Sequence, residues 1–402
     1  MLALLIYCYS HGIFSSRKIE RASYRDLYVR YLTGGTHPDH DTICNWRNAN
    51  EQAIGVCFVE VLKLARELKL LKLGTIAIDG THIRANASKD KNLTYERAEQ
   101  LDALLAQDIE ALIQEAKQAD RQEDSNDELP EQIARRDKLR EKVQQAKRDI
   151  EARAKAKAQE GQAEYLKKKA AHQKRNAGGG RPKGSPPKPP SDKPKATDQS
   201  NLSDSDSRLM RKGQNGAYSQ SYNAQASVEA QGSQLIVSAH VSQCAADTPE
   251  LEAGIDNIPK ELGRPERVLA DSGYVDREAF KRIQKRRIEL YVSVQNEAAH
   301  KQRRYDYRPE HARNKPAKKV TDPVLLDMRE KLRTEAGKEI YSKRQQSVEP
   351  AFGIIKEAMG FRQFLLRGLD KVQNEWTLVC LAYNCKRLFN LKNQEKWLKS
   401  HP

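Results

Sequence analysis

The chain has 402 residues, a length typical of two or three domains. Apolar residues make up 38% and charged residues 31%, which is too polar for one compact body throughout. Lys and Arg number 71 against 55 Asp and Glu, and the formal net charge of +16 favours a polyanionic partner, either nucleic acid or an anionic membrane surface.

The sequence argues against the membrane. Its one notable apolar run, residues 1–9, is far shorter than the roughly 20 residues of a spanning helix and lacks the features of a secretory signal. The run is typical of the middle of a helix without a cap, so we expect the natural chain to extend upstream. The six cysteines form no C-x-x-C pair, which indicates neither a zinc site nor a disulfide framework and suits a reducing cytoplasm.

Residues 1–70 predict helices. The stretch SSRKIERASYRDLYVRYLTGG indicates one helix that ends at Gly34-Gly35, with five apolar or aromatic side chains near one face: Ile19, Tyr24, Leu27, Tyr28 and Tyr31. Two more helices are expected before residue 70. A short turn between helices in a basic segment fits a DNA-reading helix-turn-helix, and an ordinary helical bundle fits the pattern equally well.

A strand is predicted over residues 74–79, GTIAID, where Thr75, Ala77 and Asp79 share one face. Gly80 follows at once, so we expect the strand to end at Asp79. An Asp-Gly pair is common in turns, and this is one interpretation of Asp79. The other is a metal ligand held at the end of a strand, which requires partners elsewhere in the chain.

Residues 91–210 differ in character from their surroundings. An amphipathic helix is followed by a second helical run with charges on nearly every face, which is typical of a solvated arm or a helical hairpin. The segment that begins at NAGGGRPKG is rich in Gly, Pro, Ser and Lys, and it predicts a disordered basic linker. The arm and linker serve either as a solvated spacer or as a surface that embraces DNA or a second copy of the protein.

Order is expected again after residue 211. Two alternating runs joined by Gln231-Gly232-Ser233 predict a hairpin, and Thr248-Pro249 predicts a helix with Thr248 as its N-cap. The stretch RVLADSGY then repeats the earlier pattern, with Asp271 at the end of an apolar strand. A helix with Asp276 as its cap and another strand are predicted to follow. Open α/β sheets bind ligands at this carboxyl edge.

A third acid, Glu349, lies in YSKRQQSVEPAFGIIKEAMG. Glu349 and Lys356 are two helical turns apart and so share a face. Pro350 disfavours helical geometry at the preceding residue, and we expect a kink or a helix start there. A solvated helix with incidental charges is the alternative interpretation.

The order of these elements is that of an RNase H-like core, and the whole chain resembles the DDE transposases of bacterial insertion sequences. The matching stretches are IDGTHIRANASK, YNAQASV with LIVSAHVSQCAADTPEL, VLADSGY and YSKRQQSVEPAFGIIKEAMGFRQFLLRG. The N-terminal segment also resembles the helical domain that precedes the catalytic core in one branch of that family.

The resemblance implies an α/β fold: an RNase H-like core with a mixed sheet, preceded by an all-α domain and interrupted by a long helical, partly disordered insertion. Three divisions are expected. Residues 1–70 form a helical DNA-binding domain, whose natural form we expect to extend upstream. Residues 71–90 and 211–392 form the catalytic domain, and residues 91–210 form the insertion. It implies an enzyme that binds the ends of an insertion sequence and catalyses metal-dependent strand cleavage and strand transfer in the bacterial cytoplasm, in association with the nucleoid.

Carried over residue by residue, the resemblance makes Asp79, Asp271 and Glu349 the catalytic and metal-binding triad. Two Mg²⁺ ions, with Mn²⁺ as a substitute, are the expected cofactors, because these hard cations take carboxylate oxygens. Asp79 is expected to bridge both ions, Asp271 to hold one and Glu349 the other. His82 is more plausibly structural or DNA-facing than a metal ligand.

The DNA-binding residues implied by the resemblance are Tyr341, Arg344 and Lys356. Arg344 lies five residues before Glu349, whereas many relatives have their arginine four before, so its role is the least secure of the three. The expected partners are element-end and target DNA, together with further copies of the chain in a synaptic complex.

Three other interpretations remain. An inactive or truncated transposase derivative would act only as a DNA-binding protein. A metal-dependent nuclease unrelated to transposition would share the triad and lack joining activity. A coiled-coil scaffold built on the helices of residues 93–160 would leave the strand-end acids and their order unexplained.

Overall fold

The computed structural model describes residues 1–121, 128–176, 185–211, 216–295 and 320–400. The chain divides into two compact units. The first unit comprises residues 1–86, 210–217 and 221–402, and the second comprises residues 87–209 and 218–220. The helices of the first 70 residues thus belong to the same unit as the sheet. In the described residues, no helix has both the length and the apolar character needed to span a bilayer.

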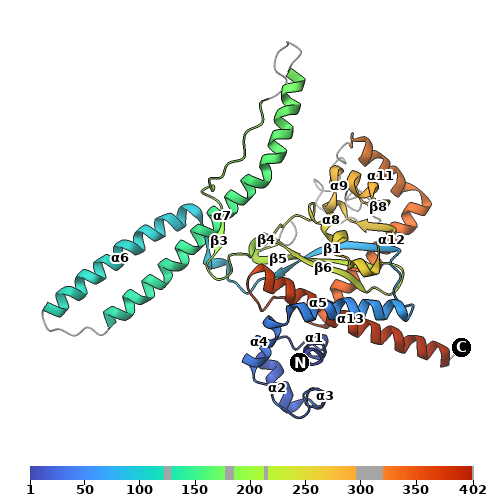
Figure 1. Cartoon of the computed structure of the whole chain (residues 1–402), viewed down its shortest axis with the longest axis horizontal. Coiled ribbons are helices and arrows are strands. Elements are labelled where there is room, and N and C mark those ends of the chain that lie inside the picture. Colours follow the sequence, from blue (N-terminus) through green and yellow to red (C-terminus); the bar gives the residue numbers. More distant parts are fainter. Residues whose placement is uncertain (122–127, 177–184, 212–215, 296–319, 401–402) are drawn as a thin grey trace, which may run out of the picture. The chain divides into compact units, whose positions relative to one another are not determined.

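The first unit is built on a mixed sheet (Figure 1), as the α/β prediction requires. Its hydrogen-bonded order is β4-β5-β1-β7-β8, and β6 pairs with β5. β1 runs parallel to β7, and β7 runs parallel to β8, whereas β5 is antiparallel to both β1 and β6. The strands are β1 (Thr75–Arg84), β4 (Arg208–Arg211), β5 (Tyr218–Glu229), β6 (Ile236–Ser242), β7 (Arg267–Ala270) and β8 (Glu289–Val292).

The prediction that the first strand ends at Asp79 is wrong, because β1 continues to Arg84. Antiparallel pairing with β5 runs along the whole strand, whereas parallel pairing with β7 stops at Ala77. Asp79 therefore lies just beyond the point where the pairing with β7 stops and only the pairing with β5 continues. The glycine signal at residue 80 did not mark a turn, because a central strand accepts glycine where other groups approach the backbone closely.

Gly80 is a place of close approach. A Cβ atom there would lie 2.5 Å from Oδ1 of Asp247 and 2.8 Å from Oδ1 of Asn223, and it would also clash with the amide of Gln225. A side chain at residue 80 would displace these groups. The glycine thus serves the packing beside Asp79 and does not end the strand.

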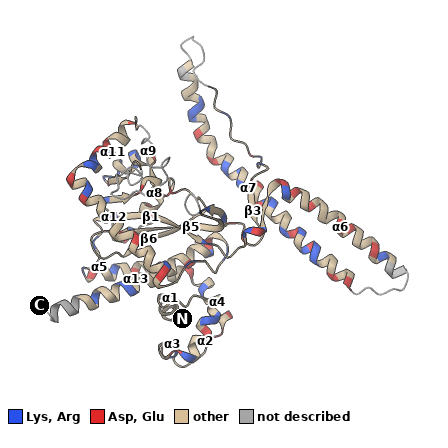
Figure 2. Ribbon diagram, turned by 180° about the vertical axis from the view of Figure 1, so that it is seen from behind, with Lys and Arg blue, Asp and Glu red and all other residues tan. Residues whose placement is uncertain are grey.

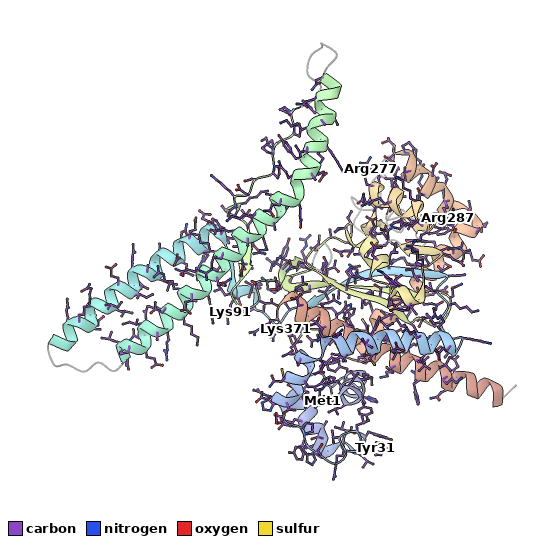
Figure 3. The ribbon with its side chains drawn as sticks, viewed as in Figure 1. Met1, Tyr31, Lys91, Arg277, Arg287 and Lys371 are labelled. Atoms are coloured by element: carbon purple, nitrogen blue, oxygen red, sulfur yellow. The ribbon has the colours of Figure 1, made fainter. Side chains whose placement is uncertain are left out.

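The N-terminal helices differ in detail from the prediction. Asp26 interrupts the expected single helix, because its side chain accepts a hydrogen bond from the Val29 amide at 3.0 Å and caps a new helix. Ile19 is buried as expected, but the aromatic side chains that follow are exposed, and Tyr31 is 85% accessible (Figure 3). The helices are α1 (Leu2–Ser10), α2 (Ser16–Arg25), α3 (Leu27–Leu32), α4 (His40–Ala49) and α5 (Glu51–Glu67).

Two C-terminal helices pack along the sheet. α12 (Glu335–Gly353) lies against β1, β7 and β8, and α13 (Leu369–Ser400) lies against β6, α1 and α5. Trp376 of α13 is fully buried, and its indole nitrogen donates to the Gln225 carbonyl at 2.9 Å. The segment from Trp376 to Leu388 thus packs in the core, as its apolar sequence predicts.

The predicted helix start at Glu349 is wrong, because α12 runs through Pro350. A proline cannot donate to the carbonyl four residues before it, which here belongs to Gln346. The side-chain amide of Gln234 donates to that carbonyl at 2.7 Å and replaces the missing bond. A π-helical turn, η5 (Ile354–Ala358), follows and carries Lys356.

The remaining elements of the first unit connect these layers. Asp276 caps its helix as predicted, accepting from the Glu278 amide at 2.9 Å. The remaining elements are α8 (Glu250–Asp256), η2 (Lys260–Leu262), η3 (Ser272–Tyr274), α9 (Arg277–Lys285) and α11 (Pro323–Arg333).

The second unit is a helical hairpin, one of the two predicted forms. α6 (Tyr95–Arg121) and α7 (Glu128–Asn176) form a small apolar core in which Ala98 and Leu105 of α6 and Val143 of α7 are buried together with Leu93, which precedes α6. A short turn η1 (Lys89–Lys91) and the paired strands β2 (Asn92–Thr94) and β3 (Gln199–Asn201) lie at its base.

The end of the predicted disordered linker has secondary structure, since β3 and β4 both lie before residue 212. β3 forms because it pairs with β2, an interaction that composition does not reveal. The Gly-rich residues 177–184 lie outside the described part of the chain.

Candidate active site

Two of the predicted acids lie where the parallel pairing between β1 and β7 ends. Asp79 is inside β1, two residues after Ala77, the last β1 residue that pairs with β7, and Asp271 follows β7 directly. Each carboxylate accepts a hydrogen bond from the backbone amide of a nearby glycine. Oδ1 of Asp79 accepts from the Gly80 amide at 2.9 Å, and Oδ1 of Asp271 accepts from the Gly273 amide at 2.8 Å.

The third predicted acid, Glu349, is linked to Asp79 by an arginine that lies between them. Arg344 of α12 places Nη1 3.2 Å from Oδ2 of Asp79 and Nη2 4.0 Å from Oε1 of Glu349. Its side chain is only 12% exposed, whereas that of Glu349 is 57% exposed. The guanidinium thus lies between a half-buried acid of the sheet and a solvent-facing acid of the helix.

Lys356 and Tyr341 complete the predicted group. Thr81 lies two residues after Asp79 and so shares its face of β1, and the Lys356 ammonium donates to the Thr81 hydroxyl. The Tyr341 hydroxyl donates to the carbonyl of Ala270 at 3.3 Å, one residue before Asp271. The structure therefore brings all six predicted residues to one edge of the sheet, although they come from four separate elements.

Burial dominates the electrostatics of this edge. It raises the pKa of Asp79 to about 6, the nearby Arg344 opposes that shift, and the negative charges of Asp271 and Asp247 add to it. Burial also raises the pKa of the Tyr341 hydroxyl, against the opposing effect of Arg344. Burial of the site therefore favours the uncharged forms of both side chains, and Arg344 counteracts this only in part.

Asp247 is a fourth acid at this edge, and the sequence interpretation assigned it no role. Its Oδ1 accepts from Nδ2 of Asn223 at 2.8 Å and from Nε2 of Gln225 at 2.7 Å. A Cβ atom on Gly273 would lie 2.9 Å from Oδ1 of Asp271 and 3.5 Å from Oδ2 of Asp247. Asp247 therefore lies close to both Gly80, which follows Asp79 in β1, and Gly273, in the turn after Asp271.

The sequence interpretation overlooked Asp247 because the following Thr248-Pro249 pair predicted an ordinary helix cap. The predicted cap is wrong: α8 begins at Glu250 with Pro249 at the N-cap position, and the Thr248 hydroxyl instead donates to the Gly273 carbonyl at 3.0 Å. Thr248 thus ties the loop after β6 to the turn after β7, and Asp247 ties the same loop to β5. The side-chain amides at residues 223 and 225, on one face of β5, were the available clue.

A buried hydrogen-bond network supports the acids from behind. The Tyr274 hydroxyl donates to Oε1 of Gln225, whose amide nitrogen donates to Asp247. Burial, together with the charges of Asp247, Asp79 and Asp271, raises the pKa of Tyr274 well above its ordinary value, so the phenol stays a donor. Since η3 carries Tyr274 three residues after Asp271, this network ties the position of Asp271 to β5.

The metal-binding capacity of the edge follows from its donors. All its acidic donors are carboxylates, which suit Mg²⁺ and Mn²⁺. Within the described ranges, no three Asp, Glu, His or Cys side chains are grouped closely enough to hold a metal ion as they stand. The imidazole of His82 faces the loop after β6, where its Nε2 lies 3.3 Å from the Ala245 carbonyl oxygen.

Two protein-family profiles match the chain. One, described as a transposase DDE domain, matches residues 193–385, and the other, described as a transposase domain (DUF772), matches residues 1–49. The first range includes Asp247, Asp271 and Glu349, whereas Asp79 precedes it. Neither a curated protein nor a solved structure matches the chain.

Proposed function

The chain belongs to the DDE transposases of insertion elements, and from this premise we propose that it binds the ends of an insertion sequence, cleaves the DNA there and joins the freed strand to a target. The observation that carries the proposal is the meeting of Asp79, Asp271 and Glu349 around Arg344 at one edge of the sheet. Their positions in the mixed sheet and the flanking helix support an RNase H-like core.

The donor chemistry fits a pair of Mg²⁺ ions, with Mn²⁺ as a substitute. The raised pKa of Asp79 reflects mainly the burial of its carboxylate, to which the negative charges of Asp271 and Asp247 add, and bound divalent cations would stabilise the ionised form. Asp79 would contact both ions, Asp271 one and Glu349 the other. Bound there, such ions activate an attacking oxygen and stabilise a leaving oxygen in phosphoryl transfer.

The protein's own cations position the DNA. Arg344 and Lys356 lie over the face of β1 that carries Asp79, so either can hold a backbone phosphate next to the acids. Arg344 also bridges Asp79 and Glu349, which supports a role for it despite its unusual spacing from Glu349. Tyr341 contacts the backbone before Asp271 and positions that strand end for the same DNA.

The remaining parts of the proposal concern the whole protein. The N-terminal helices, matched by a transposase domain, would recognise element ends, and several copies would form the synaptic complex. A bacterial cytoplasmic location at the nucleoid follows from such a substrate. The strongly positive net charge supports binding to DNA of any sequence as a first step.

The test is a cleavage and joining assay. Supercoiled plasmid that carries the flanking ends of the element is incubated with the full chain and Mg²⁺ or Mn²⁺, beside the Asp271→Asn variant. We expect cut and joined products that depend on the metal and disappear in the variant. Cutting without joining would indicate a nuclease, and DNA binding without cutting in either protein would overturn the proposed activity.

A further inference from the structure

The charges of the helical hairpin are divided between two regions. α6 carries seven acidic and three basic residues, and it runs beside the first half of α7 (Figure 2). Three cross-helix ion pairs result: Arg140–Asp102 at 2.9 Å, Lys147–Glu99 at 3.3 Å and Arg136–Asp108 at 3.7 Å. In this half of the hairpin, basic residues have acidic neighbours.

The second half of α7 has no such balance. Residues 151–176 contain eight basic and three acidic residues, and α6 does not extend alongside them. Ile150 is the last buried side chain of α7, and none of the described side chains from Glu151 to Gln173 is buried. The described part of this half is therefore a solvent-exposed helix without an apolar core, and its side chains are mostly charged or small and not packed in an interior.

A proline-rich segment covers one stripe of this helix. Ala154, Ala158, Gly161 and Tyr165 recur at helical spacing and are half-buried, and a Cβ atom on Gly161 would lie 3.5 Å from Cβ of Pro190. In the covering segment, Pro187, Pro190 and Pro194 are half-buried, whereas Lys188, Lys193 and Lys195 are exposed. The prolines thus face the helix and the lysines face solvent.

Further lysines flank the covered stripe on both sides. Lys157 and Lys168 are eleven residues apart and so lie along one side, and Lys155 and Lys169 lie along the other. Lys168 pairs with Glu164 at 2.6 Å, and Lys169 lies over the Tyr165 ring, 5.9 Å from its centroid. Lys155 and Lys157 have no ion-pair partner among the described side chains.

We propose that this basic arm, defined as residues 151–176 with residues 185–198, binds the phosphate backbone of duplex DNA without reading its sequence. The proposal rests on the proposed function and deepens it, since it adds a DNA-contacting surface outside the catalytic unit. The lysines between residues 155 and 169 extend over about 21 Å of helix, the length of roughly six phosphates along one strand. Exposed ammonium groups on flexible stems suit such contacts, which position DNA and carry no base specificity.

The alternative occupant is an acidic surface on a second copy of the chain, for example α6. Charge complementarity favours DNA over this partner, because three of the seven acids of α6, Glu99, Asp102 and Asp108, already form ion pairs with α7 of the same chain. DNA also offers a regular array of negative charges along the full length of the arm.

The test compares two triple variants of the full chain. Lys155→Gln, Lys157→Gln and Lys169→Gln neutralise the arm, and Lys117→Gln, Lys138→Gln and Lys142→Gln remove the same charge from exposed positions of the hairpin half. Binding to a 30-base-pair duplex without element ends is followed by fluorescence anisotropy over a series of KCl concentrations. Circular dichroism checks that both variants retain their helices.

We expect the arm variant to bind at least about tenfold more weakly at 0.1 M salt. Its salt-dependence slope should be smaller by about 2.7, or about 0.9 for each phosphate that no longer has a lysine partner. The control variant should keep the wild-type slope. Equal slopes in the arm variant and the wild type, equal reductions in both variants, or a change confined to the oligomeric mass would each overturn the proposal. The duplex carries no element end, so this result is independent of the cleavage assay that tests the proposed function.

Discussion

The sheet edge and the helical insertion place charge in opposite environments. At the sheet edge, Asp79 is mostly buried beside two other acids and one arginine, and the surroundings shift its pKa to about 6. In the insertion, the ion pairs between α6 and α7 are partly exposed, and the basic arm is solvated. The buried charges, which are costly in free energy, therefore lie at the proposed catalytic site, and the solvent-exposed charges lie at the proposed DNA-binding surface.

The largest effect expected from this contrast concerns the acids and cations of the sheet edge. Glu349→Gln should abolish strand cleavage, by on the order of a thousandfold or more, and leave DNA binding intact, because it removes a carboxylate and no DNA contact. Lys356→Glu should instead weaken binding, because it places a negative charge where a phosphate is held. Cleavage assays and anisotropy measure the two effects, and an equal decrease of binding in both variants would contradict the division of roles.

The buried charge of Asp79 also predicts a pH-dependent stability. A carboxyl whose pKa is raised from 3.8 to about 6 in the folded protein binds its proton more tightly there than in the unfolded chain. The folded state therefore loses stability relative to the unfolded chain as the pH rises between those values. In metal-free buffer, Asp79→Asn should therefore gain stability relative to the wild type, from nothing near pH 4 to at most about 3 kcal/mol above pH 7. Urea unfolding at several pH values measures this difference. A constant difference across the range would show that the surroundings do not shift the Asp79 pKa.

The close packing beside Asp79 predicts a smaller effect. Gly80→Ala should destabilise the protein by about 1–3 kcal/mol, because its Cβ would press on Asn223 and Asp247. Gly353→Ala is the matched control: this helical glycine has no atom within 4 Å of an added Cβ, and alanine should stabilise the helix by roughly 0.5–1 kcal/mol. Thermal unfolding of both variants measures the contrast, and similar values of either sign would contradict it.

The ion pairs of the insertion predict the smallest effect. A double-mutant cycle on Arg140→Gln and Asp102→Asn should give a coupling energy below about 1 kcal/mol, because both side chains are partly solvated. The coupling should fall further at high salt. A value of several kcal/mol would show that the hairpin holds its charges as tightly as the sheet edge does.

Local signals predicted much of this molecule. The hairpin of β5 and β6 and the Asp276 cap follow from periodicity and turn chemistry, which act over a few residues, whereas the mixed α/β class was implied by the family resemblance. Local signals failed to predict the strand that continues past Gly80, the helix that continues through Pro350 and the role of Thr248. At each of these positions a group from elsewhere in the chain takes part: Asp247, the Gln234 amide and the Gly273 carbonyl, respectively.

The order of the three acids and the excess of positive charge can be read from the amino-acid sequence alone, because they are properties of the residues and their spacing. Folding places Arg344 between Asp79 and Glu349, Asp247 beside Gly80 and Gly273, and prolines over one stripe of α7 while lysines remain exposed. These contacts have one cause in common. They join residues far apart in the chain, and their positions are set by the packing of β5, α12 and α7 and not by their neighbours in sequence.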